Sequence, residues 1–201
     1  MVGAWEDKTA NEDDVTQGTA DNKPTLQTNE LNGEPTLRFD GSNDYLQGAF
    51  TTGGALTQPF TLLAVAELTS TGSVYRYITD GDDASNRMVS GQRDDGDWWI
   101  YPGSPALAGD PSDTNWNIWT VVYNGLSSQI WLNGVSEVSG EAGTDEADGL
   151  TVGGSYTGAA SWWLGDIAEI IIYDSELNTA DKNEVGNYMA DRYNLSYSDI
   201  T

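Results

Sequence analysis

The sequence predicts an all-β protein, a two-sheet antiparallel jelly-roll sandwich with one C-terminal helix packed on it. Apolar or alternating runs are short and are bounded by clusters of Gly, Asn, Asp and Ser, as strands between turns are. The 201 residues include 23 glycines, which suits a chain with many tight turns. One segment, close to the C-terminus, has apolar residues at helical spacing instead. The length favours a single domain over residues 1–201, without a linker or an internal repeat.

Ten strands are expected from the positions of the apolar and alternating runs. They are Thr36–Phe39, Tyr45–Phe50, Phe60–Leu68, Val74–Thr79, Arg87–Gln92, Trp98–Tyr101, Ile118–Tyr123, Gln129–Leu132, Leu150–Val152 and Trp163–Tyr173. The stretch IWLNGVSEV contains Asn133-Gly134, the strongest short signal for a β-hairpin. This number of short strands is typical of a sandwich or jelly roll.

The helix is predicted from about Thr179 to Arg192. Its apolar positions fall at offsets of 3, 4 and 8 residues and are Val185, Tyr188, Met189 and Tyr193. Asn178 is a suitable N-cap, and Asp181 lies in the first turn, where the helix dipole favours an acid. The Tyr/Met stripe must therefore pack on the sandwich.

Composition excludes several classes of function. With 32 Asp and Glu against 8 Lys and Arg, the net charge of −24 repels phosphate backbones and anionic lipids, so neither nucleic acid nor membrane is an expected partner. Such a surface suits a halophilic or marine setting, where salt screens the self-repulsion. The absence of Cys and His rules out disulfides, zinc–thiolate sites and His-dependent nucleophile systems. The N-terminal MVGAWEDKT has no signal-peptide pattern, so export would use another route or a segment upstream of this chain.

Three stretches resemble LamG-like jelly-roll domains of the concanavalin A-like lectin/glucanase superfamily. They are AWEDKTANEDDVTQGTADNKPTLQTNELNGEPTLRFDGSNDYL, IWLNGV and LGDIAEIIIYDSELNTADKNEVGNYMADRYNL, which together span nearly the whole chain. The resemblance implies a sandwich that binds sugars, binds proteins or hydrolyses glucans, because fold alone does not imply function.

The sequence lacks the paired acids that the superfamily's glucanases place on one strand as Glu-x-Asp-x-Glu or Glu-x-Asp-x-x-Glu. Residues 137–141, EVSGE, have no middle Asp. Asp166 and Glu169 are three residues apart, which puts them on opposite faces of a regular strand. Glu169, among apolar neighbours, is expected to be partly buried and paired with Arg38. A non-catalytic protein is therefore expected.

Adjacent tryptophans raise the question of an outer aromatic face. In DWWIY, Ile100 should face the core, which turns Trp98 inward and Trp99 outward with Tyr101. In SWWLGD the resemblance implies an apolar residue two before Gly165, which is Trp163, so Trp163 should point inward and Trp162 outward. Trp131 alternates against Ile130 and Leu132 and should also point outward. Exposed rings are platforms for sugars, and Asn86, Arg87 and Arg93 would supply hydrogen bonds or pair with an anionic sugar. A subunit interface and ordinary packing are the alternatives for these rings.

The loop TDGDDASN is a candidate calcium site. Asp80, Asp82 and Asp83 are close in sequence, and Ca²⁺ takes six to eight oxygen ligands from carboxylates and carbonyls. The spacing is not that of an EF-hand. An acidic, solvated turn is the alternative.

These observations favour a non-catalytic, lectin-like carbohydrate-binding module. Its expected partner is a cell-surface or extracellular polysaccharide, and its expected location is an extracellular surface or a virion. The alternative is a phage or virus structural protein, a capsid decoration or a tail or fibre component, whose aromatic face makes homo-oligomer or virion contacts.

Overall fold

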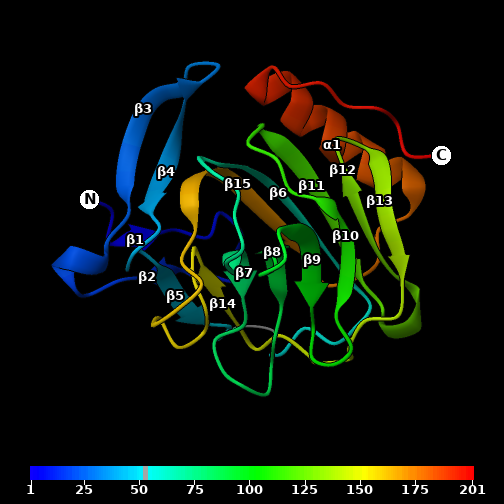
Figure 1. The fold of residues 1–201 in the computed structure, drawn as a ribbon, viewed down its shortest axis with the longest axis horizontal. Helices are drawn as coiled ribbons and strands as arrows, with labels where there is room; N and C mark the ends of the chain where they lie inside the picture. Colours follow the sequence, from blue (N-terminus) through cyan, green and yellow to red (C-terminus); the bar gives the residue numbers. More distant parts are fainter. Residues whose placement is uncertain (52–53) are drawn as a thin grey trace.

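The computed structural model describes residues 1–51 and 54–201, and it confirms the predicted all-β sandwich (Figure 1). Among these residues the strands form two antiparallel sheets, one of eight strands and one of seven. The 8-stranded sheet has the order β1 (Ala4–Trp5), β2 (Val15–Thr16), β5 (Leu46–Ala49), β14 (Gly149–Val152), β7 (Arg76–Asp80), β8 (Val89–Gln92), β9 (Asp97–Tyr101) and β10 (Leu107–Pro111). The 7-stranded sheet has the order β13 (Val135–Gly140), β12 (Ser128–Leu132), β11 (Asn117–Tyr123), β6 (Phe60–Leu68), β15 (Leu164–Tyr173), β4 (Glu34–Asp40) and β3 (Thr25–Leu31). Short 3-10 turns occupy Ala20–Asn22 and Gly125–Ser127.

The main core lies between the two sheets and is filled by alternate residues of their strands. Strand β6 points Leu62 and Ala64 into this core and Leu63 and Val65 to the other face, yet all four are fully buried. A second apolar layer on the outer face of the 7-stranded sheet explains this, and it explains why the β6 sequence is apolar without alternation.

Helix α1 (Thr179–Tyr193) provides that second layer, as the sequence predicted. Met189 and Tyr193 pack with Leu63 and Val65 of β6. Asn178 caps the helix by accepting a 3.0 Å hydrogen bond from the backbone N–H of Asp181. In Figure 1, α1 lies beside β11 and β12, away from β7, β8 and β9. Among the described residues, no helix therefore covers the outer face of the 8-stranded sheet.

One residue of the predicted helix stripe does not pack inward. Tyr188 is 43% exposed, and its hydroxyl donates to Glu169 of β15 over 3.1 Å. The apolar stripe that α1 packs on the sheet is therefore narrower than the sequence indicated. Tyr188 lies at the edge of this stripe, with its hydroxyl hydrogen-bonded to Glu169.

Each of the ten predicted strands corresponds to a strand of the structure, and Asn133-Gly134 forms the predicted turn between β12 and β13. Both residues have positive φ, 52° and 77°, as a type I′ turn requires. Asn32-Gly33 makes a second such turn, with φ of 50° and 83°, between β3 and β4. The β3 half of that hairpin was not predicted, because its residues are mostly polar and exposed.

Candidate functional site

Four aromatic rings gather on the uncovered outer face of the 8-stranded sheet. Trp99 and Tyr101 come from β9, Tyr77 comes from β7, and Tyr75 is the residue directly before β7. The ring centroid of Trp99 lies 5.4 Å from that of Tyr75, 5.9 Å from that of Tyr77 and 5.6 Å from that of Tyr101. These separations are typical of favourable aromatic pairs. We call these four residues the outer aromatic cluster.

A glycine in the intervening strand allows the rings to meet across it. Gly91 of β8 is the register partner of both Tyr77 and Trp99, so the residue between the strands that carry these two rings has no side chain. A Cβ atom on Gly91 would also lie 2.1 Å from the carbonyl oxygen of Arg76. The backbone of β7 therefore leaves no room for a side chain at this position.

The predicted direction of the paired tryptophans is confirmed, but the predicted exposure of Trp99 is wrong. Trp98 packs in the main core and Trp99 on the opposite face, yet Trp99 is only 5% exposed. Its three aromatic neighbours cover it, and its indole N–H is buried without an acceptor among the described residues. Tyr75, 37% exposed, presents the most accessible ring of the cluster. Trp99 is thus a buried ring against which the more accessible rings of Tyr75 and Tyr101 pack.

The cluster forms the wall of an open cleft of about 650 Å³, which we call the outer cleft. Its lining comprises Tyr75, Tyr77, Arg87, Arg93, Asp94, Trp99, Tyr101, Ser104 and Ala106. Four of the predicted sugar-binding residues therefore come together here: Trp99, Tyr101, Arg87 and Arg93. Tyr75 and Tyr77 were missed, although their spacing of two in VYRYI places them on one face of a strand.

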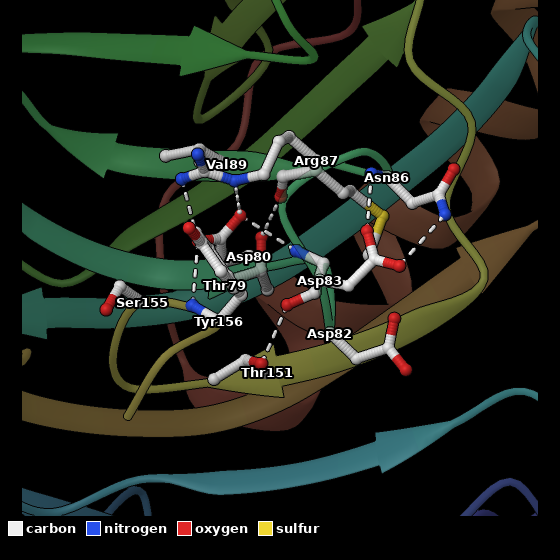
Figure 2. A network of polar contacts seen from close by, with 12 residues as sticks. Thr79, Asp80, Asp82, Asp83, Asn86, Arg87, Val89, Thr151, Ser155 and Tyr156 are labelled. Carbon is white, nitrogen blue, oxygen red and sulfur yellow. Dashed lines mark hydrogen bonds and ion pairs between the residues drawn. The ribbon is translucent and has the colours of Figure 1, made fainter. Parts of the chain in front are cut away.

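Arg87 is held at the cleft by a fully buried carboxylate. Its Nε donates to Oδ1 of Asp80 over 2.7 Å and its Nη2 to Oδ2 over 2.8 Å, and Figure 2 shows the two groups facing each other. The backbone N–H groups of Gly81 and Tyr156 also donate to this carboxylate, each over 2.9 Å. Burial raises the pKa of Asp80, and the hydrogen bonds from Arg87 oppose that shift. The guanidinium lies 5.5 Å from the ring centroid of Tyr101 and 4.8 Å from that of Tyr156.

A bulge in β7 puts Asp80 where it can meet Arg87. The register between β7 and β8 shifts between Tyr77 and Thr79. Ile78 lies in the main core, and the buried hydroxyl of Thr79 bonds to that of Ser90. Two successive side chains of β7 therefore point to the inner face of the sheet. The alternation therefore changes before Asp80, as bulges generally re-aim the following side chains.

Arg93 lies at another part of the cleft lining and is also paired. Its Nη2 bonds to Asp95, and Asp94 lines the cleft beside it. The Arg93 side chain is 32% exposed, against 16% for Arg87. The guanidinium of Arg87 is thus held by a buried carboxylate, and that of Arg93 is more accessible.

Three of the predicted sugar-binding residues lie outside the outer cleft. Trp131 does point outward from β12, but it is only 5% exposed, because Lys182 of α1 lies 4.5 Å from its ring centroid and Ile200 packs on it. The prediction that it is accessible is therefore wrong. Trp162 is partly buried in the segment before β15, and Asn86 bonds to Asp148 over 2.7 Å.

The proposed calcium ligands also separate in the structure. Asp80 is occupied by Arg87, so its assignment with Asp82 and Asp83 is corrected. Asp82 and Asp83 instead join Asp148, with one carboxylate oxygen of each within 4.8 Å of the others. Asp148 was missed because it comes from a loop distant in sequence. Carboxylate oxygens are ligands that Ca²⁺ takes, so the predicted calcium stays a prediction, and the structure changes its candidate ligands to Asp82, Asp83 and Asp148.

Asp82 and Asp148 disfavour each other's negative charge. One Oδ1 of Asp82 and one of Asp148 are buried without a partner among the described residues. Burial, followed by the hydrogen bond and charge of Asp148, raises the pKa of Asp82 to about 6. A neutral Asp82 can donate a hydrogen bond to Asp148, which an ionised one cannot.

Replacing Asp148 with asparagine should stabilise the protein more at pH 8 than at pH 5. Because the pKa of Asp82 is raised by folding, its stabilising contribution is complete below about pH 4 and is lost as the pH rises through about 6. The variant removes the neighbouring charge that causes part of this loss. Melting temperatures at the two pH values test this, with exposed Asp174→Asn as a control of equal charge change. An equal shift at both pH values would contradict it.

Calcium binding at the same acids has a separate test. If Ca²⁺ binds there, 5 mM Ca²⁺ should raise the melting temperature of the unmodified protein and have little effect on Asp148→Asn. An equal rise in both proteins would place the effect elsewhere on the acidic surface.

Acids also meet arginines on the outer face of the 7-stranded sheet. A bulge in β15 between Ile167 and Glu169 puts Asp166 and Glu169 on the same face, so the predicted opposite orientation is wrong. Asp166 pairs with Arg38 of β4 over 2.6 Å, and Glu169 pairs with Arg192 of α1 over 3.5 Å. Arg38 is therefore the partner of Asp166 rather than of Glu169. These acids connect strands and the helix to one another.

Comparison with known proteins identifies the fold and no family. No family model matches the chain, and no curated protein sequence matches it. Among solved structures it resembles the Trypanosoma rangeli sialidase in complex with the inhibitor DANA, with 14% identity and a TM-score of 0.60 over 86% of this chain and 29% of that one. It also resembles the botulinum neurotoxin serotype D binding domain, with 14% identity and a TM-score of 0.69 over 92% of this chain and 48% of that one.

A third similar structure is close to this chain in length. Domain 4 of AbnA, an extracellular GH43 arabinanase from Geobacillus stearothermophilus in complex with arabinotriose, has 13% identity and a TM-score of 0.58 over 85% of this chain and 82% of that one. The chain thus spans less than half of the sialidase and toxin chains but most of this domain. At such identities the likeness defines a shared β-sandwich fold. No helix of the described chain is long and apolar enough to span a membrane.

Proposed function

We propose that the chain is a non-catalytic, LamG-like carbohydrate-recognition module that binds polysaccharide through the outer cleft. The observation that carries the proposal is the outer aromatic cluster, placed on the one sheet face that no helix covers. The accessible ring of Tyr75 and the partly exposed ring of Tyr101 offer apolar faces to a sugar. Arg87 and Arg93 offer N–H donors for hydroxyl groups beside those rings.

Two similar structures that hold sugar ligands support this proposal. Domain 4 of AbnA holds arabinotriose, and a botulinum neurotoxin DC binding domain of TM-score 0.61 holds SialylT. We also propose that the module lies on an extracellular surface. The alternative is a virion component whose outer aromatic cluster contacts another subunit.

Tyr75→Ala should weaken polysaccharide binding about tenfold, because one aromatic contact is typically worth ~1–1.5 kcal/mol. The unfolding midpoint should change little, since the Tyr75 ring is 37% exposed. Tyr188→Ala is the matched control: its ring is 43% exposed but lies on α1, away from the cleft. A glycan array followed by isothermal calorimetry on the best ligand measures both variants.

Two outcomes would contradict the sugar-binding proposal. Equal affinities for Tyr75→Ala and the unmodified protein would remove the outer cleft from the binding site. A self-associated protein that binds no glycan, and that Tyr75→Ala converts to a folded monomer in light scattering, would support the virion component instead.

A further inference from the structure

The charges around the outer cleft indicate which class of glycan it takes. Two guanidinium groups line the cleft, those of Arg87 and Arg93, and each already has a carboxylate partner. Asp94 adds a third carboxylate to the surroundings, beside those of Asp80 and Asp95. The cleft therefore offers donors for hydrogen bonds without a surplus of positive charge.

Arg87 is the clearest case. Asp80 takes the Nε and one Nη2 proton, and Nη1 has no partner among the described residues. Since Asp80 is fully buried, its negative charge stays beneath the guanidinium whatever binds above. A ligand thus meets N–H donors whose charge is compensated, a combination that suits hydroxyl and ring oxygens.

The overall charge of the protein also disfavours a negatively charged ligand. The net charge of −24 produces a negative field that opposes a polyanion over about 10 Å at 0.1 M salt. A binding site for polyuronate or sulfated chains would need uncompensated cations to overcome that field. The eight basic residues of the chain are too few to do so away from the cleft.

We infer that the outer cleft recognises an uncharged, hydroxyl-rich glycan, an inference that depends on the proposed function of the same cleft. The tyrosine rings contact the CH faces of the sugar, and the guanidinium groups donate to its oxygens. Acidic polysaccharides are rejected by Asp94, Asp95 and the overall charge.

The experiment compares neutral and acidic polysaccharides under matched conditions. Laminarin, arabinan, galactan and agarose are the neutral probes, and polygalacturonate, alginate and κ-carrageenan are the acidic ones. At least one neutral probe should bind, with an affinity that changes less than about twofold between 0.05 and 0.5 M NaCl, because no ion pair forms with the ligand. None of the acidic probes should bind at 0.05 M NaCl.

A double variant tests the local charges directly. Asp94→Asn with Asp95→Asn leaves Arg93 uncompensated, so binding of polygalacturonate at 0.05 M NaCl should appear and should weaken at least fivefold at 0.5 M. Asp174→Asn with Asp191→Asn makes the same change in net charge away from the cleft and should leave polygalacturonate unbound. Binding by both double variants would overturn the local argument.

The results separate this inference from the proposed function. Binding of an acidic probe by the unmodified protein, weakened by salt and by Tyr75→Ala, would overturn the inference and keep the sugar-binding cleft. Failure of every neutral and acidic probe to bind would overturn both.

Discussion

Replacing Arg87 with alanine is expected to lower the free energy of unfolding by about 3–5 kcal/mol at pH 7.5, the usual cost of leaving one member of a buried ion pair alone. The partner that remains, Asp80, is 0% exposed in the folded protein, so its charge depends on the groups packed around it rather than on water. Two backbone N–H groups still donate to the carboxylate, but they carry no compensating charge. Urea denaturation followed by tryptophan fluorescence measures the loss.

The loss should be smaller at pH 5 than at pH 7.5. Burial already raises the pKa of Asp80 in the folded protein, and removal of Arg87 raises it further. A group whose pKa is raised by folding stabilises the protein most below its unfolded pKa and loses that contribution as the pH rises through its folded pKa. Protonation of Asp80 therefore removes part of the penalty in acid.

Arg93→Ala is the matched control for Arg87→Ala. It deletes the same side chain from the same cleft, but the Arg93–Asp95 pair is accessible, with side-chain exposures of 32% and 41%. Such surface pairs contribute about 0–1 kcal/mol. Equal losses for the two variants, or a loss for Arg87→Ala that grows in acid, would contradict the role assigned to Asp80.

Trp163→Ala should destabilise the protein by about 3–5 kcal/mol through the cavity that it leaves. Trp163 is 0% exposed and packs in the main core between the sheets. Trp162→Ala should lower the free energy of unfolding distinctly less, because the ring of Trp162 is only partly buried and lies outside that core. Chemical denaturation of the two variants side by side gives the comparison, and equal losses would mean that Trp162 is packed as tightly as Trp163.

The pair Trp98 and Trp99 does not offer the same contrast. Both are buried, at 2% and 5% exposure, although they face opposite sides of the sheet. Alternation predicts the side to which a residue points, but exposure depends on what the rest of the chain places above it. For Trp99 these are Tyr75 and Tyr77, which come from across β8, and Tyr101 of its own strand. For Trp131 they are Lys182 and Ile200.

The interior of the fold could be predicted from sequence more completely than its edges. Strands such as Phe60–Leu68 carry enough apolar side chains to define themselves, and the prediction matches β6 residue for residue. The strands β1, β2, β3, β10 and β13 were missed because they are very short or largely accessible, so their sequences have little reason to be apolar. Their partners are set by tertiary pairing.

Several residues of the candidate site were predicted from the sequence, but the contacts that bring them together were not. Arg87 and Arg93 were identified by the scarcity of basic residues, and the outer face by the alternation in β9. The contribution of Gly91 depends on which strands flank β8, and the contact between Asp80 and Arg87 depends on a bulge. Neither the order of strands in a sheet nor a β-bulge could be predicted from the local sequence.

The position of β15 has a consequence for how the chain folds. This late strand lies between β6 and β4, so that Asp166 meets Arg38, 128 residues earlier. Until it is in place, the β3–β4 hairpin has no neighbour in its sheet, and an isolated two-stranded hairpin is marginal in water. The 7-stranded sheet therefore cannot close on a growing chain until residues 164–173 have left the ribosome. Sheet formation is expected to be late, after most of the chain is synthesised, and to take milliseconds to seconds, as in other proteins with many non-local strand pairs.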